Sequence, residues 1–469
     1  MDASATSFSD SEKLLGRWSS GRDVLTTASL LLLANSVLRG VRAPGRFPYT
    51  HLLFNYQFGF SKRALLGTII STLNITALYH YSFFFWFSVS IFSGILVLLV
   101  RQIVALRKAD VTQGKYIALV FSSSMAIVFM AHTMGYLEQV SLLLTLWLIG
   151  IRGFYLRILL TLVLFPISLL IHESGFLLFF PALLFRFFAD LAVLSEWRSR
   201  MALGATVAVV VATVLILSQA RLSDAAATAM YHAVQAKADY PLRRDAFIMT
   251  VVGSYDSLVM TLASWRSPSM RAYFLYSTVV TLPTTLYIVW SSIKMLLARG
   301  YDWRMGSLVI CASVAPLALN VLGFDFARWA ALATTSSFLV FCVATLYLPV
   351  KIGQKESRYV GSLVTACALV ALNLSSTIPL FDGYGVNNFP YGEQLEEFLG
   401  VTKGTKSFPP EPAQCEEQGC VKAIDGQCSR SAMIPAEFLK PNHGMLDCVD
   451  ESLKVDPWSV RIARFLAQP

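Results

Sequence analysis

Charged residues are scarce in this chain. Asp, Glu, Lys and Arg together make up 14% of its 469 residues, whereas soluble domains average about 25%. Hydrophobic residues reach 55%, so the chain cannot cover its surface with polar groups in water. This composition excludes an ordinary soluble enzyme and a disordered protein. It predicts a protein whose solvent is the lipid bilayer.

Nucleotide-binding motifs are also missing. The sequence contains neither a Walker A pattern nor G-x-G-x-x-G, which argues against ATP-driven transport and against a Rossmann-type glycosyltransferase. We expect no cofactor. The net charge is +9, but in a membrane protein such an excess reflects orientation and lipid head groups more often than nucleic acid. Membrane lipid, and no nucleic acid, is therefore the expected partner.

The sequence contains many long runs of apolar residues. A crossing helix needs about 20 mostly apolar residues, because the hydrocarbon core is about 30 Å thick. We predict an all-α polytopic membrane protein with about eleven transmembrane helices, at residues 23–39, 82–100, 116–132, 139–151, 156–172, 174–190, 202–219, 272–293, 306–322, 329–350 and 359–380. The first lacks the small-residue site of a cleaved signal peptide, so it is expected to be an uncleaved signal anchor.

Basic residues between these runs predict the orientation. Cytoplasmic loops are enriched in Lys and Arg, and placing the N-terminus inside makes every short inside loop basic. The prediction is a cytoplasmic tail at 1–22, a transmembrane domain at 23–380 with outer loops at 40–81 and 220–271, and an extracytoplasmic segment at 381–469. The apolar stretch 64–80 is expected to be re-entrant or interfacial, and DAAATAMYHAVQAKA predicts a surface helix.

Four of the seven cysteines cluster in the polar C-terminal segment: Cys415, Cys420, Cys428 and Cys448. An even cluster in a small, loop-rich segment favours two disulfides, which persist only in oxidising compartments. The pairing is Cys415–Cys420 with Cys428–Cys448 or one of two other arrangements. The spacings lack a C-x-x-C pair, so a metal site is the weaker interpretation, and no metal is expected. The other cysteines, in apolar runs, are expected to be packing residues.

The first outer loop is basic, with no acidic residue between positions 40 and 63. Its cations, including the residue that precedes it, are Arg39, Arg42, Arg46, Lys62 and Arg63. One interpretation is anchoring to lipid head groups. The other is a phosphate clamp, because Arg presents a planar fork of donors and stays charged. An anionic lipid-linked substrate arriving from the bilayer would need such a clamp at head-group depth.

Further titratable residues fall on the same predicted side of the membrane. They are His132 and Glu138 in HTMGYLEQ, His172 and Glu173 in HESG, Asp325 and Arg328 in GFDFARW, and Arg243, Arg244 and Asp245 in the long loop. Helix capping is an ordinary explanation for His132 and Glu138, and a local i,i+3 ion pair is one for Asp325 and Arg328. A solvated surface is an ordinary explanation for the group in the long loop. The pair at His172 and Glu173 adjoins an apolar span, where ionisable groups are costly unless partnered or used.

A set of cations, histidines and carboxylates facing outward suits transfer chemistry on lipid-linked intermediates. A departing diphosphate can be neutralised by Arg and Lys without a metal, for which Lys62, Arg63, Arg46, Arg328, Arg243 and Arg244 are the substrate-binding candidates. The acceptor hydroxyl needs a general base, for which the catalytic candidates are Glu173, His172, Glu138 and Asp325.

Three segments carry a resemblance to a known family: NYQFGFSKRALLG after the first span, HESGFLLFFPALL opening the sixth and GFDFARW before the tenth. In these segments the chain resembles the bacterial Wzy-type polysaccharide polymerases and O-antigen ligases, which are related to the GT-C glycosyltransferases. The resemblance implies inverting glycan transfer from undecaprenyl diphosphate at the periplasmic face of the inner membrane, alongside other polysaccharide-assembly proteins. It implies diphosphate contacts at Lys62, Arg63 and Arg328. The acid-free first loop favours a metal-independent member.

Three alternatives stay open. A membrane O-acyltransferase that modifies glycans needs a His within the membrane, and His172 fits that description. A transporter or flippase for lipid-linked glycan predicts polar residues near the midplane and an internal repeat, neither of which is evident. A non-catalytic scaffold leaves the acid-free basic loop unexplained.

Overall fold

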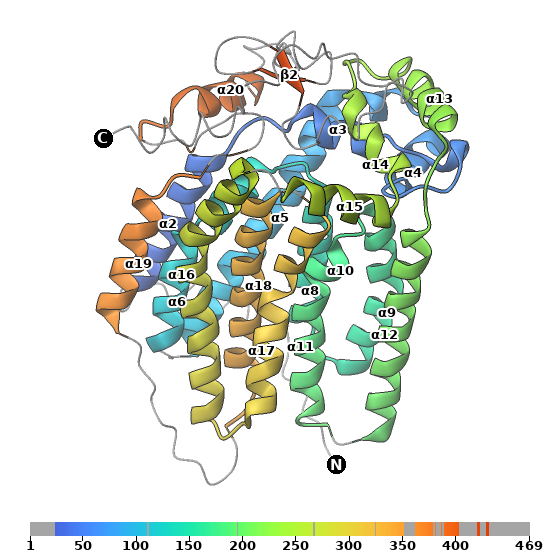
Figure 1. Ribbon diagram of the computed structural model, residues 1–469. Coiled ribbons are helices and arrows are strands. Elements are labelled where there is room, and N and C mark those ends of the chain that lie inside the picture. Colours follow the sequence, from blue (N-terminus) through green and yellow to red (C-terminus); the bar gives the residue numbers. More distant parts are fainter. Residues whose placement is uncertain are drawn as a thin grey trace.

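The computed structural model describes residues 24–109, 112–194, 196–265, 268–323, 325–350, 362–378, 380, 386, 389–402, 420–422 and 428–430. Apart from one short hairpin, the regular structure in these residues is helical. Long helices run side by side between two ends, and shorter ones gather at one of these ends, at the top of Figure 1. The predicted class of α-helical membrane protein is confirmed.

Six helices are long and apolar enough to cross a membrane. They are α5 (Tyr81–Lys108), α9 (Phe154–Ile171), α12 (Trp197–Ser218), α16 (Pro268–Ala298), α17 (Trp303–Val314) with its continuation η5 (Ala315–Val321), and α18 (Phe326–Leu346). A seventh crossing results if the pair α6 (Thr112–Ser122) and α7 (Met125–His132), bent by 45°, counts as one span.

The eleven predicted spans exceed this number, although each coincides with helix. Shorter apolar helices stand at three of them: α2 (Val24–Gly40), α8 (Glu138–Gly150) and α19 (Leu363–Ser375). The stretch 174–190 is divided into α10 (Gly175–Leu178) and α11 (Phe180–Leu191). At 1.5 Å per residue, a 13-residue helix such as α8 is about 20 Å long and does not cross a 30 Å core by itself. Apolar runs therefore located the helices but overstated how many are full-length spans.

Helix α18 lies at the centre of the bundle and is buried along nearly its whole length. Its sequence is rich in Ala, Ser and Thr, whose small side chains let neighbouring helices approach closely. Ser336 Oγ donates to the carbonyl of Leu178 at 2.6 Å, and the hydroxyls of Thr334 and Thr285 are 2.8 Å apart. Because α18 is held from several sides, residues at its start have fixed positions.

The two predicted outer loops form a cap at one end of the bundle (Figure 1). The cap consists of α3 (Arg46–Leu52), η2 (Tyr56–Phe58), α4 (Leu65–Leu73), η3 (Thr76–Tyr79), α13 (Asp224–Gln235), η4 (Arg244–Phe247), α14 (Ile248–Val251) and α15 (Ser254–Ser264). The predicted surface helix is α13, and the stretch 64–80 forms the short elements α4 and η3. Phe54 and Phe247 pack at 4.8 Å between ring centroids and join the two loops.

The C-terminal segment contributes α20 (Gly392–Thr402), which also lies at the capped end, and a hairpin of β1 (Cys420–Lys422) and β2 (Cys428–Arg430). Cys415 and Cys448 lie outside the described residues, as do the side chains of Cys420 and Cys428. No disulfide is found in the described part of the chain, where Cys311, Cys342 and Cys367 are free. Cys342 is buried as expected, and the other two are exposed. The two disulfides stay a prediction.

Candidate functional site

A buried polar cluster lies where the cap meets the ends of the long helices. Helix α3 and the loop after η2 supply two members, the start of α8 one, the turn between α9 and α10 three, and the start of α18 two. We call this group the polar cluster: His51, Arg63, Glu138, His172, Glu173, Ser174, Asp325 and Arg328. All four predicted catalytic residues belong to it, as do two of the six predicted substrate-binding residues.

Arg63 and Glu173 form a bidentate ion pair. Arg63 donates from Nε to both carboxylate oxygens, at 3.2 and 3.1 Å, and from Nη2 to Oε1 at 2.7 Å. Burial alone would raise the pKa of Glu173, but the charges of Arg63 and Lys62 hold it well below its ordinary value. Glu173 is therefore an anchor for Arg63 and a weak base.

The backbone of Arg63 has a φ of 63°, in the left-handed region that non-glycine residues seldom adopt. Such a conformation costs on the order of 1 kcal/mol and persists where surrounding contacts fix it. Arg63 Nη1 also lies 3.4 Å from Nδ1 of His51. Burial, followed by the charge of Arg63, lowers the pKa of His51 well below its ordinary value, so this imidazole is neutral at pH 7.

His172 occupies the turn just after α9, between a hydroxyl and a carboxylate. Its Nδ1 is 2.6 Å from Ser174 Oγ, and its Nε2 is 3.6 Å from Glu138 Oε2. Burial and the charge of Arg63 keep the pKa of His172 well below its ordinary value. Glu138 Oε2 is buried and accepts no hydrogen bond from the described residues. A neutral imidazole thus faces a carboxylate oxygen with free acceptor capacity.

Arg328 joins two carboxylates at the start of α18. Its Nη1 is 3.3 Å from Glu138 Oε1, and its Nη2 is 2.5 Å from Asp325 Oδ2. The second contact is the predicted i,i+3 pair. The guanidinium also lies over the rings of Trp329 and Tyr136, at 4.1 and 5.2 Å. Glu138 and Arg328 are 190 positions apart in the sequence, so only the tertiary fold brings them together.

The other predicted basic residues are bound by backbone carbonyls of neighbouring segments. Lys62 Nζ is 3.4 Å from Val252 O, and Arg46 Nε is 3.0 Å from Pro241 O. Arg42 donates to His132 O, and Arg39 to the carbonyls of Asn373 and Ser376. The loop-one cations therefore tie segments together and do not converge on one point, although Lys62 lies close to Arg63 and Glu173.

Of the predicted residues in the long loop, Arg243 contacts helix α3, which carries His51. Arg243 is buried, its amide donates to Thr50 Oγ1 at 3.0 Å, and its guanidinium lies 5.3 Å from the ring centroid of Phe47. The side chains of Arg244 and Asp245 lie outside the described residues. His51 and Ser174 are the members that sequence reasoning missed. Ser174 stands two positions after His172, and His51 is the one His within residues 40–63, so both signals were available.

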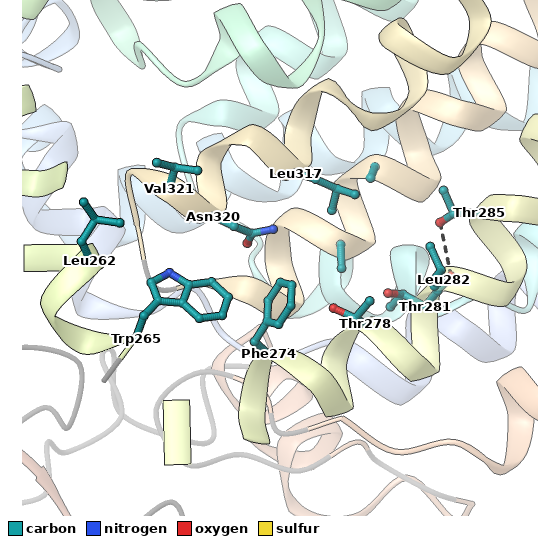
Figure 2. A pocket seen from close by; sticks show the side chains of 12 residues that line it. Leu262, Trp265, Phe274, Thr278, Thr281, Leu282, Thr285, Leu317, Asn320 and Val321 are labelled. Carbon is teal, nitrogen blue, oxygen red and sulfur yellow. Dashed lines mark hydrogen bonds between the residues drawn. The ribbon is translucent and has the colours of Figure 1, made fainter. Parts of the chain in front are cut away.

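Two cavities flank α18, and the smaller one adjoins the polar cluster. The smaller, between Glu138, Arg328 and Phe179, has about 10 Å³ of space, which is room for roughly one water molecule. The larger has about 440 Å³ and is apolar (Figure 2). A substrate that reaches Glu138 must therefore displace part of the cap or enter past α18.

Within the described residues, no group of three or more His, Cys, Asp and Glu side chains is placed to hold a metal ion. Comparisons of the chain with models of protein families, with curated proteins and with solved structures find no match. The interpretation of the site therefore depends on its own geometry.

Proposed function

We propose that the protein is a metal-independent glycosyltransferase or glycan polymerase that uses a polyprenyl-diphosphate-linked donor. In this proposal it is a GT-C-like enzyme of the bacterial inner membrane, with its N-terminus in the cytoplasm and both the cap and the C-terminal segment in the periplasm. The polar cluster is the active site. Its position, buried at one end of apolar helices, suits a donor whose reactive group sits at head-group depth.

The observation that carries the proposal is the arrangement around Glu138. One of its oxygens is held by Arg328, and the other is unbonded within the described chain and faces neutral His172. A carboxylate with a free oxygen next to an imidazole is suited to accept the proton of an acceptor hydroxyl. The oxygen of the deprotonated acceptor hydroxyl then attacks the anomeric carbon of the donor sugar. The bond from this carbon to the diphosphate breaks, with inversion at the carbon.

Arg63 and Arg328 are suited to the departing diphosphate. Each guanidinium already holds carboxylate oxygens with its planar fork, and phosphate oxygens are an equivalent geometric match. Fixed cations that stabilise charge as it develops on a leaving group typically contribute a factor of about 10²–10³ to the rate.

The test measures the glycan made by host cells, resolved by chain length, for Glu138→Gln and Arg328→Ala at matched membrane abundance. We expect loss of long chains with accumulation of lipid-linked single units. Arg304→Ala, at an exposed position on α17, is the matched control and should behave as the parent does. Normal chain lengths in both site variants would contradict the proposal.

A second function, O-acyl transfer to a glycan, is favoured by the row of Ser174, His172 and Glu138. A hydroxyl, an imidazole and a carboxylate in contact are the components of nucleophilic acyl transfer. If this function is correct, Ser174→Ala abolishes acylation of the glycan and leaves its chain length unchanged. Under glycosyl transfer, the same substitution removes one hydrogen bond and leaves both readouts nearly unchanged.

A further inference from the structure

The larger cavity lies on the side of α18 opposite to the polar cluster. Ala330 and Ala333 line it, whereas Arg328 and Leu332 line the small cavity beside Glu138. Its remaining walls come from α15, α16 and η5, and its volume is about 440 Å³. Figure 2 shows Trp265 and Phe274 along one wall and Leu317 across from them.

One polar side chain in this cavity has an unused hydrogen-bonding group. Asn320 is 8% exposed, and its Oδ1 has no hydrogen-bond partner in the part of the chain that the structure describes. Figure 2 shows its amide above the rings of Trp265 and Phe274, facing the cavity. Leaving a buried amide unpaired costs about 1–3 kcal/mol. The amide oxygen accepts hydrogen bonds, so a ligand with a hydroxyl group at this point would satisfy it.

The depth of Asn320 indicates which polar group that is. The candidate span formed by α17 and η5 runs from Trp303 to Val321, so Asn320 stands one residue from its end. The ends of a span lie near the boundary between hydrocarbon core and head groups, which places Asn320 within reach of a hydroxyl on a lipid head group.

Below this level the cavity is suited to hydrocarbon. Thr278, Thr281 and Thr285 follow one another along α16. The hydroxyl of Thr281 donates to Ser277 O at 2.8 Å, and that of Thr285 to Thr281 O at 3.2 Å, so both hydroxyls already have partners in the protein. Leu262 and Val321 at the rim are 55% and 49% exposed, which leaves an apolar approach from the bilayer side.

We propose that this cavity binds one acyl chain of a phosphatidylglycerol-like lipid, with a head-group hydroxyl donating to Asn320 Oδ1. A polyprenyl chain has no hydroxyl along its length and would leave Asn320 Oδ1 unpaired, so the occupant differs from the donor of the proposed transfer reaction. The proposal does not depend on that reaction.

The experiment uses the full-length protein in nanodiscs of phosphatidylethanolamine and phosphatidylglycerol. One sample contains phosphatidylglycerol with a diazirine in one acyl chain, and a parallel sample contains a polyprenyl phosphate with a diazirine. After irradiation, mass spectrometry locates the labelled peptides. We expect the acyl probe to label residues 278–285, and Asn320→Leu, of similar size, to lower that labelling roughly fivefold through loss of one hydrogen bond.

Ala333→Trp fills the cavity and should abolish the labelling, whereas Ile310→Trp, on the exposed face of α17, is the matched control and should retain it. Unchanged labelling in both Asn320→Leu and Ala333→Trp would overturn the proposal. Labelling of residues 278–285 by the prenyl probe and not by the acyl probe would also overturn it, and would assign the cavity to the lipid-linked donor.

Discussion

Helix α9 has a buried charge cluster at each end, and the two clusters differ in how their charges are satisfied. Near its start, fully buried Arg157 donates from Nε to the carbonyls of Leu148 and Ile151, both at 3.1 Å, and also binds Asp190. Arg186 binds the same Asp190 and lies 3.9 Å from the ring centroid of Tyr347. Main-chain carbonyls at helix ends need donors, so this cluster completes the local structure.

At the other end of α9, contacts between charged side chains hold the polar cluster together. Arg63 and Arg328 bind carboxylates, two neutral histidines stand beside them, and Glu138 Oε2 has no hydrogen-bond donor among the described residues. A buried ion pair by itself is weak support for a role in stability. The comparison teaches that burial of charge does not by itself single out a candidate site, and that the polar cluster differs by its unsatisfied acceptor next to a neutral base.

Removal of Arg63 is expected to have the largest effect on activity. Arg63→Ala should lower glycan transfer about 10²–10³-fold, because a cation that faces the leaving group is lost. Arg63→Lys should not restore the rate, since an ammonium group cannot bind in the bidentate manner. The measurement is the rate of transfer per folded protein in membranes. Restoration by Lys would mean that charge alone is needed and would weaken the assignment of the clamp.

Removal of Asp190 should instead affect stability. Asp190→Ala leaves Arg157 and Arg186 without their shared carboxylate, and breaking a buried pair in this way typically costs about 3–5 kcal/mol. We expect a clear drop in the thermal unfolding midpoint in detergent, with transfer activity per folded molecule retained. If Asp190→Ala kept its stability but lost activity, the predicted difference between a stabilising cluster at one end of α9 and a functional cluster at the other would be wrong.

The polar cluster should also make stability sensitive to acid. The pKa values of His51 and His172 are lowered in the folded protein, so below about pH 6.5 the unfolded chain binds protons that the folded chain does not. The free energy of unfolding should then decrease as the pH drops below about 6.5, by up to about 1.4 kcal/mol per pH unit for each histidine. Thermal unfolding between pH 7 and 5 measures this slope. His51→Gln with His172→Gln should flatten it, whereas His232→Gln, at an exposed position on α13, should not.

The smallest effect is expected at Ser174. Its hydroxyl contacts His172 at 2.6 Å, and loss of one such hydrogen bond costs about 0.5–1.5 kcal/mol of stability. Ser174→Ala should therefore change glycan chain length little if the protein is a glycosyltransferase. A complete loss of acyl groups from the glycan would move the assignment to acyl transfer.

Sequence predicted the local parts of this structure well. Apolar runs located the helices, and the spacing of Asp325 and Arg328 predicted their contact, because an i,i+3 pair follows from helix geometry alone. Membrane sidedness predicted that His172, Glu173 and the first outer loop belong to one end of the bundle, and they do lie together.

The sequence did not predict which residues far apart in the chain contact each other. Arg63 and Glu173 are 110 positions apart, and no local pattern specifies which cation meets which carboxylate. The same limit explains the basic first loop, where the residues expected in a phosphate clamp bind carbonyls such as Pro241 O whose positions depend on the packed cap. The number of spans was overstated for a related reason, since breaks such as the one between α6 and α7 depend on packing and not on hydropathy.

The charges at both ends of α9 have a mechanical consequence. A piston motion of this helix by one residue, about 1.5 Å, would strain the bonds of Arg157 at one end and those of His172 and Glu173 at the other. Helix α9 therefore acts as a fixed strut. Because Arg63 pairs with Glu173 just beyond this end of the helix, the strut also fixes the adjoining part of the cap in place.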